Sequence, residues 1–173
     1  MTTYLVLFRG VYGPMLPVQP LKAALIEDGF EQVVTYINTG NVVLVSSKTP
    51  KQIIERVSAI VLKHFNFSKH IMVVSKAEWT KTIRDNPYPV EEPRKLHVFI
   101  LEKEPHIDAV KALAEKATGP EQFEIRGRVL YYYTPQDFSN GTLHPKIERT
   151  LGVAATARNW NTVLKLQDLA AAV

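Results

Sequence analysis

Residues 35–45 constrain the fold most, because two strand-forming runs flank a tight turn there. Val, Ile, Tyr and Thr, which dominate both runs, suit a pleated and half-buried surface. The turn residues Asn38, Thr39, Gly40 and Asn41 separate the runs. Asn and Gly accept positive φ, and Asn side chains also bond turn amides. The stretch therefore predicts a β-hairpin that extends over about residues 32–45.

The segments around this hairpin predict the remaining elements of the first half. Strands are expected at residues 4–8 and 71–74, and helices at about 21–26 and 50–65. Thr49 and Pro50 are typical of a helix start, and Ser75 with Glu78 has the capping-box pattern of a further helix. The resulting order β-α-β-β-α-β is the split βαβ or ferredoxin-like order.

The same order begins again after a stretch with three prolines at residues 87–94. Strands at 96–101, 123–126, 129–133 and 153–157 are expected, with helices at 106–117, 143–151 and 159–171. Both halves open their hairpin with Glu-Gln and place a Trp after the fourth strand. The sequence thus predicts an α+β fold, a tandem duplication of two ferredoxin-like halves with an extra C-terminal helix. The predicted domains are 1–86 and 95–173, joined by the linker 87–94.

Composition excludes several classes of protein. The chain has no cysteine, which excludes thiol catalysis and cysteine-ligated metals and fits a reducing compartment. Its longest apolar runs are about five residues, against the ~20 that a membrane-spanning helix needs. The N-terminus does not have the pattern of a signal peptide. These features predict a soluble, cytoplasmic protein that does not enter a membrane.

Charge and titratable residues point to an anionic partner more than to a metal. The net charge is +4, with basic ends and an acidic middle. Basic ends are compatible with an anionic partner, although an ordinary solvated surface is the preferred explanation of them. The five histidines do not have ligand-type spacing with carboxylates, and phosphate-loop or nucleophile-elbow motifs are absent. We expect neither a metal nor a cofactor.

Two polar stretches are candidates for a binding site. Residues 38–41 form either a simple turn or a polar tip that meets a ligand. Arg158, Asn159 and Asn161 stand where a strand runs into a helix, and free amides at such a junction favour anions. Arg158 would add a bidentate donor there. The alternative is structural: Asn159 caps the helix, Trp160 is core and Arg158 makes an ion pair at the surface. Arg9, at the end of a buried strand, either joins this site or pairs with a carboxylate.

The hairpin at residues 126–133 contains three consecutive tyrosines. The hairpin begins with a basic residue followed by glycine, and it places Tyr131 and Tyr133 on one face. This pattern is faintly similar to a strand of the RNA-recognition motif. Arg128 and Leu130 occupy positions where that motif has aromatic residues. Packing of aromatic side chains across strands is the preferred interpretation.

Four stretches together resemble the domain-of-unknown-function 1697 family, which consists of uncharacterised, mostly bacterial proteins. They are Phe8-Arg9-Gly10-Val11, Thr35-Tyr36-Ile37-Asn38-Thr39-Gly40-Asn41-Val42, Asn86-Pro87-Tyr88-Pro89 and Ala155-Thr156-Ala157-Arg158-Asn159-Trp160-Asn161-Thr162-Val163. The resemblance implies a two-part α+β protein and no established reaction. This chain departs from the family in a shorter loop after Gly10. It also has the uncharged Asn140-Gly141-Thr142 where relatives carry a basic segment.

Two classes of function follow from these observations. The first is a binding module for an anionic partner, a phosphorylated small molecule or nucleic acid, with a polar site between the two halves. Its expected ligand-binding residues are Arg9, Asn38, Thr39, Gly40, Asn41, Arg158, Asn159 and Asn161. The second is a small enzyme of unknown reaction with its site at the same place, for which the sequence identifies no acid or base. A structural role without a ligand is a third interpretation.

Overall fold

The computed structural model describes residues 1–173, which group into two compact units. Unit 1 comprises residues Met1–Arg84 and Leu164–Val173, and unit 2 comprises Asp85–Val163. The last ten residues therefore belong with the first unit, a grouping that the sequence does not predict. None of the helices combines the length and the apolarity that crossing a membrane requires.

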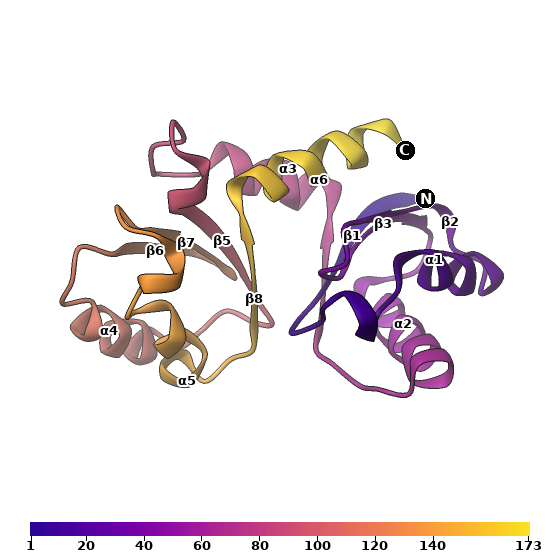
Figure 1. The fold of residues 1–173 in the computed structure, drawn as a ribbon, viewed down its shortest axis with the longest axis horizontal. Coiled ribbons are helices and arrows are strands. Elements are labelled where there is room, and N and C mark those ends of the chain that lie inside the picture. Colours follow the sequence, from indigo (N-terminus) through magenta and orange to yellow (C-terminus); the bar gives the residue numbers. More distant parts are fainter. The chain divides into compact units, whose positions relative to one another are not determined.

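Unit 1 contains a four-stranded antiparallel sheet with the order β2-β3-β1-β4. Its elements are β1 (Thr2–Phe8), a 3₁₀ turn η1 (Gly13–Met15), α1 (Val18–Glu27), β2 (Glu31–Tyr36), β3 (Asn41–Ser46), α2 (Pro50–Phe65), β4 (Ile71–Ser75) and α3 (Lys76–Arg84). Helices α1 and α2 lie along one face of this sheet (Figure 1). Alternate strand residues such as Val6, Phe8, Val42 and Leu44 form the core between these layers.

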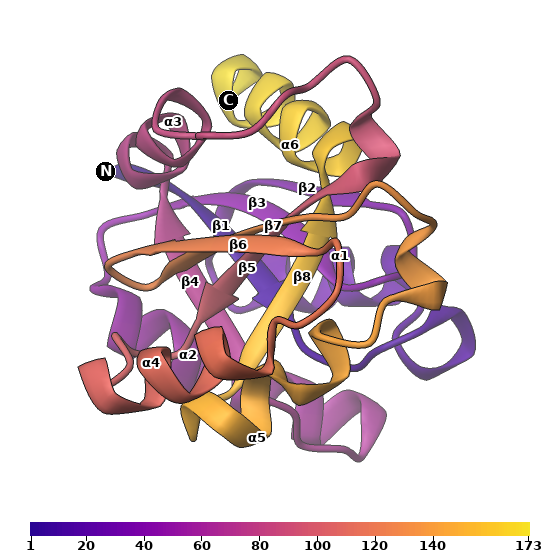
Figure 2. The same ribbon diagram turned by 90° about the vertical axis from the view of Figure 1, so that its left-hand side faces the viewer.

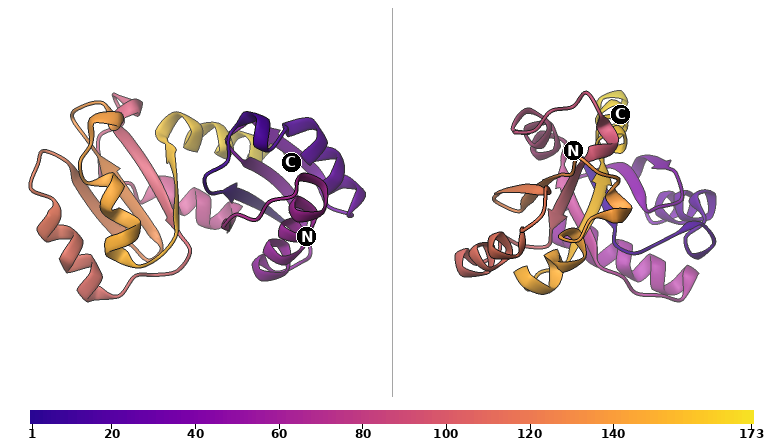
Figure 3. Two further views of the ribbon diagram at one scale, coloured as in Figure 1. Left: turned by 60° about the horizontal axis from the view of Figure 1, so that its bottom comes forward. Right: turned by 60° about the vertical axis from the view of Figure 1, so that its left-hand side comes forward.

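Unit 2 contains a second four-stranded antiparallel sheet with the order β6-β7-β5-β8. Its elements are η2 (Pro93–Lys95), β5 (Leu96–Leu101), α4 (Ile107–Lys116), β6 (Gln122–Arg126), β7 (Val129–Tyr133), η3 (Phe138–Asn140), η4 (His144–Lys146), α5 (Ile147–Leu151) and β8 (Ala155–Asn159). Helix α6 (Trp160–Ala172) begins in this unit. Helices α4 and α5 lie on the same face of the sheet (Figures 2 and 3).

Local signals in the sequence account for several element boundaries. Thr49 and Gln52 form a full capping box at the start of α2, with Pro50 as its first residue. At Ser75, both the backbone amide and the hydroxyl donate to Glu78, whose amide donates back to the Ser75 hydroxyl. The predicted hairpin is β2–β3. These predictions are confirmed.

The molecule is a mixed α/β protein with two four-stranded antiparallel sheets and six α-helices. In each sheet the third strand lies between the first and the second, and the fourth strand pairs with the first. A helix follows the fourth strand in both cases, namely α3 and α6, and carries a buried Trp, Trp79 or Trp160. The C-terminal helix is therefore not an extra element of the second half. The ferredoxin-like assignment and the duplication stay predictions.

Candidate functional site

The β2–β3 turn of unit 1 is held in a strained backbone conformation. Ile37 has φ 45° and Gly40 has φ 79°, and a positive φ is rare for a β-branched residue such as Ile. The buried Asn41 side chain donates to the Tyr36 carbonyl at 3.2 Å and to Thr39 Oγ1 at 3.1 Å. Asn41 thus fixes the shape of the turn from inside, while Asn38 and Thr39 are exposed at its tip.

The loop that follows β1 packs tightly against this turn. The Phe8 amide donates to the Gly40 carbonyl at 2.9 Å. A Cβ at Gly40 would lie 2.5 Å from Phe8 Cβ, and a Cβ at Gly13 would lie 2.5 Å from Asn38 Nδ2. Real Cβ atoms do not approach other atoms so closely, so at Gly40, with its positive φ, only glycine fits, whereas a Cβ at Gly13 would displace the Asn38 side chain. The two glycines therefore allow the loop and the turn to interlock.

Segments that carry basic residues meet at the same end of β1. The Arg9 amide donates to the His70 carbonyl at 3.0 Å, which ties the end of β1 to the start of β4. A Cβ at Gly10 would lie 3.9 Å from Lys69 Nζ. Residues 8–16, 37–41 and 66–71 contain Arg9, Lys69 and His70 but neither Asp nor Glu. We call these three segments together the β1-end site.

The predicted site residues divide between the two units. Arg9, Asn38, Thr39, Gly40 and Asn41 come together in unit 1, through the β1–β3 pairing that ends at Leu7 and Asn41 and through the packing described above. Arg158, Asn159 and Asn161 belong to unit 2. Their membership of one site with the unit 1 residues stays a prediction.

Arg158 lies within β8, buried, with only 8% of its surface exposed. Its Nη1 donates to Thr156 Oγ1 and to the Ala157 carbonyl, each at 2.7 Å. Burial lowers the pKa of its guanidinium to about 10. The sequence predicts this side chain beside the free amides of a helix start. In the structure it bonds Thr156 and Ala157 of its own strand instead.

Asn159 and Trp160 have the structural roles of a helix cap and a core residue, while Arg158 is buried and not at the surface, where its ion pair is expected. Asn159 Oδ1 accepts a hydrogen bond from the Thr162 amide at 2.9 Å, as a helix cap does, and α6 begins at the next residue. Trp160 is buried and Asn161 is exposed on the helix. Of the three unit 2 candidates, Asn161 is the one whose side chain reaches solvent.

Sequence reasoning missed a buried carboxylate, Glu121, just before β6. Its oxygens accept hydrogen bonds from the Tyr132 hydroxyl, from Thr142 Oγ1 at 2.9 Å and from the Leu143 amide at 3.0 Å. Burial raises the pKa of this carboxyl, but the hydrogen bonds from Tyr132, Leu143 and Thr142 outweigh it, so the pKa lies below its ordinary value. The pKa of Tyr132 is raised by burial and by the Glu121 carboxylate.

A stack of three rings lies beside Glu121 on the helix-covered face of the sheet. Phe138 is sandwiched between His97 and His144, with ring centroids 3.9 and 4.0 Å away. His97 Nδ1 and His144 Nε2 are buried without hydrogen-bond partners. Burial, together with the neighbouring His144, lowers the pKa of His97 to about 4. A histidine inside the apolar strand at 96–101 was the sequence signal for this cluster.

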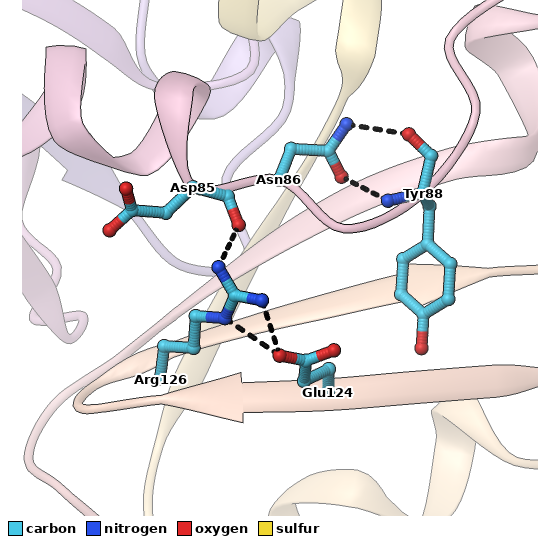
Figure 4. Close-up of polar contacts among 5 residues, drawn as sticks. All are labelled: Asp85, Asn86, Tyr88, Glu124 and Arg126. Carbon is cyan, nitrogen blue, oxygen red and sulfur yellow. Dashed lines mark hydrogen bonds and ion pairs between the residues drawn. The ribbon is translucent and has the colours of Figure 1, made fainter.

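The opposite face of the unit 2 sheet carries Tyr131 and Tyr133 of the 126–133 hairpin, whereas Tyr132 points to the helix-covered face. Arg126 bonds the Glu124 carboxylate through Nε at 2.7 Å and also donates to the Asp85 carbonyl (Figure 4). Tyr88, held by two hydrogen bonds with Asn86, stacks on Tyr133 with centroids 5.7 Å apart. Tyr131 is fully buried. The aromatic packing across strands that the sequence predicts is present between Tyr132 of β7 and Phe99 of β5, with centroids 6.0 Å apart. Tyr131 is not available as a platform for bases.

Cavities and metal-ligand clusters add no further candidate. Unit 1 has a surface cavity of about 310 Å³ lined by residues including Asp28, Arg56 and His64. Unit 2 has one of about 370 Å³ lined by residues including His106, Ile107 and Val110. Neither contains a predicted site residue. The structure holds no group of three or more His, Asp or Glu side chains arranged to bind a metal ion.

Comparison with known proteins defines the family and the fold. The model of the family described as a protein of unknown function, DUF1697, matches residues 1–131. The structure is similar to that of the conserved bacterial protein SP0830 from Streptococcus pneumoniae, with a TM-score of 0.72 and 20% sequence identity over 98% of each chain. At this identity the likeness concerns the fold alone. No curated protein matches the chain.

Proposed function

Because this chain belongs to the DUF1697 family, whose function is unknown, we propose from its own residues that it is a binding module for an anionic group. The group is a phosphate, free or part of a phosphorylated small molecule, and it binds at the β1-end site of unit 1. The observation that carries the proposal is that the segments carrying Arg9 and Lys69 meet beside the polar β2–β3 turn. Cation side chains and turn amides are the donors that phosphate binding uses.

The geometry favours one compact anionic group over a long polyanion. The basic residues of this site are confined to the end of one strand and the start of another. A nucleic acid is recognised by a basic stripe or groove that follows its backbone. Nucleic acid is therefore the second candidate. The alternative function is an enzyme with its active site at the β1-end site. We propose no catalytic residue for it.

The strained turn supports a binding role for this end of the molecule. A non-glycine residue with positive φ costs of order 1–3 kcal/mol and persists where the surroundings hold it. At Ile37 the turn carries such a cost while Asn38 and Thr39 stay exposed. Strain of this kind clusters at ligand-binding loops. A rigid turn loses little entropy when it binds a ligand.

We also propose that the two units derive from duplication of one ferredoxin-like unit. The equal strand order of the two sheets and the Trp-bearing helix after each fourth strand support this origin. Localisation in the cytoplasm stays a prediction. On this proposal unit 1 carries the anion site, and Arg158 in unit 2 has a structural role through Thr156 and Ala157.

Thermal unfolding in phosphate tests the proposed function. Phosphate at constant ionic strength should raise the Tm of the wild type above that in chloride, because a ligand that binds the folded state stabilises it. The variants R9Q and K69Q should lose most of this rise. The matched control K51Q removes an exposed lysine at the start of α2 and should keep it.

An equal Tm in phosphate and chloride would refute the proposed function. A shift of duplex DNA or single-stranded RNA in a mobility assay, weakening steeply with salt, would favour nucleic acid as the partner instead.

A further inference from the structure

The segment 134–146, between β7 and α5, packs into the unit 2 core through Leu143 and is also attached to the sheet by two sets of contacts that include titratable groups. The first is Glu121, which bonds Thr142 and Leu143 from the segment and Tyr132 from β7. The second is the ring stack, in which Phe138 and His144 from the segment pack on His97 from β5. Both fastenings involve titratable groups, so both respond to protons.

The Glu121 fastening depends on a glycine at the point of closest approach. A Cβ at Gly141 would lie 2.6 Å from the Tyr132 hydroxyl oxygen and 2.8 Å from Glu121 Oε1. Gly141 has φ −65°, an ordinary value, so space rather than backbone conformation requires glycine here. The uncharged Gly141 and Thr142 let the segment lie directly on the carboxylate.

The His97 fastening holds its imidazole in the neutral form. Only 9% of His97 is exposed, and its Nδ1 is buried without a hydrogen-bond partner. The titratable groups that face it are His144 from η4, Tyr132 from β7 and, through Tyr132, Glu121. Asn159, its partner on β8, is neutral. A proton on His97 would thus create a buried charge next to a second imidazole, which is costly.

We propose that segment 134–146 is an acid-sensitive latch, closed at neutral pH and released from the sheet when His97 becomes protonated. Release would expose the apolar surface that Phe138 covers on Phe99 and Tyr132. The latch is a conformational device of unit 2 and is independent of the β1-end site.

The direction of the pH effect follows from linkage. The pKa of His97 in the closed state, about 4, is below the unfolded value of about 6.5. The open state therefore binds more protons, so the latch is at full strength above pH 6.5 and weakens as pH falls toward 4. Between pH 7.5 and 5 these two values give a rise of about 30-fold in the opening equilibrium. Glu121, with a lowered pKa, adds to the loss only at more acidic pH.

Hydrogen exchange followed by mass spectrometry tests the latch in the full chain. After correction for the intrinsic exchange rate, protection of the peptide covering 134–146 should fall about 30-fold between pH 7.5 and 5. Protection of β1 should stay constant over this range. The variant H97F keeps a ring in the stack and removes the titrating group, so its protection should not depend on pH. The control H64Q, which removes an exposed histidine of α2, should behave as wild type.

Constant protection of 134–146 in the wild type would overturn the proposal, and so would a 30-fold fall that persists in H97F. If H97F does not fold, E121Q decides in its place. It should lower protection at pH 7.5 through its weakened bonds to Tyr132 and Thr142, and keep the 30-fold dependence. A pH-independent E121Q would contradict the role of His97.

Discussion

At the residue scale, the burial of two charged side chains could not be predicted from the sequence. Arg158 and Glu121 both sit in polar-looking stretches, and both are buried. The carboxylate of Glu121 is held by Tyr132, Thr142 and Leu143, which lie 11 to 22 residues further along the chain. Local sequence patterns carry no record of such contacts. The turn glycine Gly40, in contrast, follows from its own neighbours in sequence.

Replacing Gly40 with Ala should lower the free energy of unfolding by more than about 2 kcal/mol. The substitution places a Cβ at φ 79° and 2.5 Å from Phe8 Cβ, so a steric cost adds to the backbone cost of about 1–2 kcal/mol. The control is G29A, because Gly29 has φ 91° and open space around its Cβ position. Urea denaturation measures both. Equal losses in the two variants would contradict the close packing of loop and turn.

Replacing Arg158 with Ala should destabilise the chain by about 3 kcal/mol. The change leaves Thr156 Oγ1 and the Ala157 carbonyl without the guanidinium and opens a cavity at a buried position. The control R149A removes an exposed arginine of α5 and should cost less than about 0.5 kcal/mol. If R158A is as stable as R149A, Arg158 is not part of the folded interior, and its place in a ligand site regains support.

At the element scale, the sequence predicts most strands and helices because their signals are local. Hairpin β2–β3 follows from its turn chemistry, and α2 from its cap and its apolar period. Local signals do not predict that helix α6 is divided between the two units. Its residues from Leu164 onward group with unit 1, and Gln167 exchanges hydrogen bonds with Thr80 of α3. This pairing joins positions far apart in sequence, which no local pattern encodes.

The capping box of α2 offers a measurement of one local signal. T49A should lower the free energy of unfolding by about 1 kcal/mol, because the Gln52 amide loses its acceptor at the helix start. T49S keeps a hydroxyl and should cost little. Thermal or urea unfolding distinguishes the two variants. A loss as large in T49S as in T49A would show that the cap hydroxyl is not what stabilises this end.

At the scale of the whole molecule, the distribution of charge, and not the net charge, is the basis for proposing the β1-end site. The formal net charge of +4 spreads over 173 residues and singles out no surface. The fold brings Arg9, Lys69 and His70 to the end of β1, next to a turn that the sequence marks as polar. Five of the eight predicted site residues lie there because strand pairing brings the β2–β3 turn to the end of β1. The pairing of β1 with β4 adds Lys69, which sequence reasoning did not include.

A titration of the ¹⁵N-labelled protein with inorganic phosphate, followed by amide chemical shifts at constant ionic strength, tests the β1-end site most directly. The account predicts saturable shifts confined to residues 9–13, 38–41 and 69–70, and their loss in R9Q. The K51Q control should reproduce the wild-type shifts. Saturable shifts at other residues only, or none up to millimolar phosphate, would contradict the account.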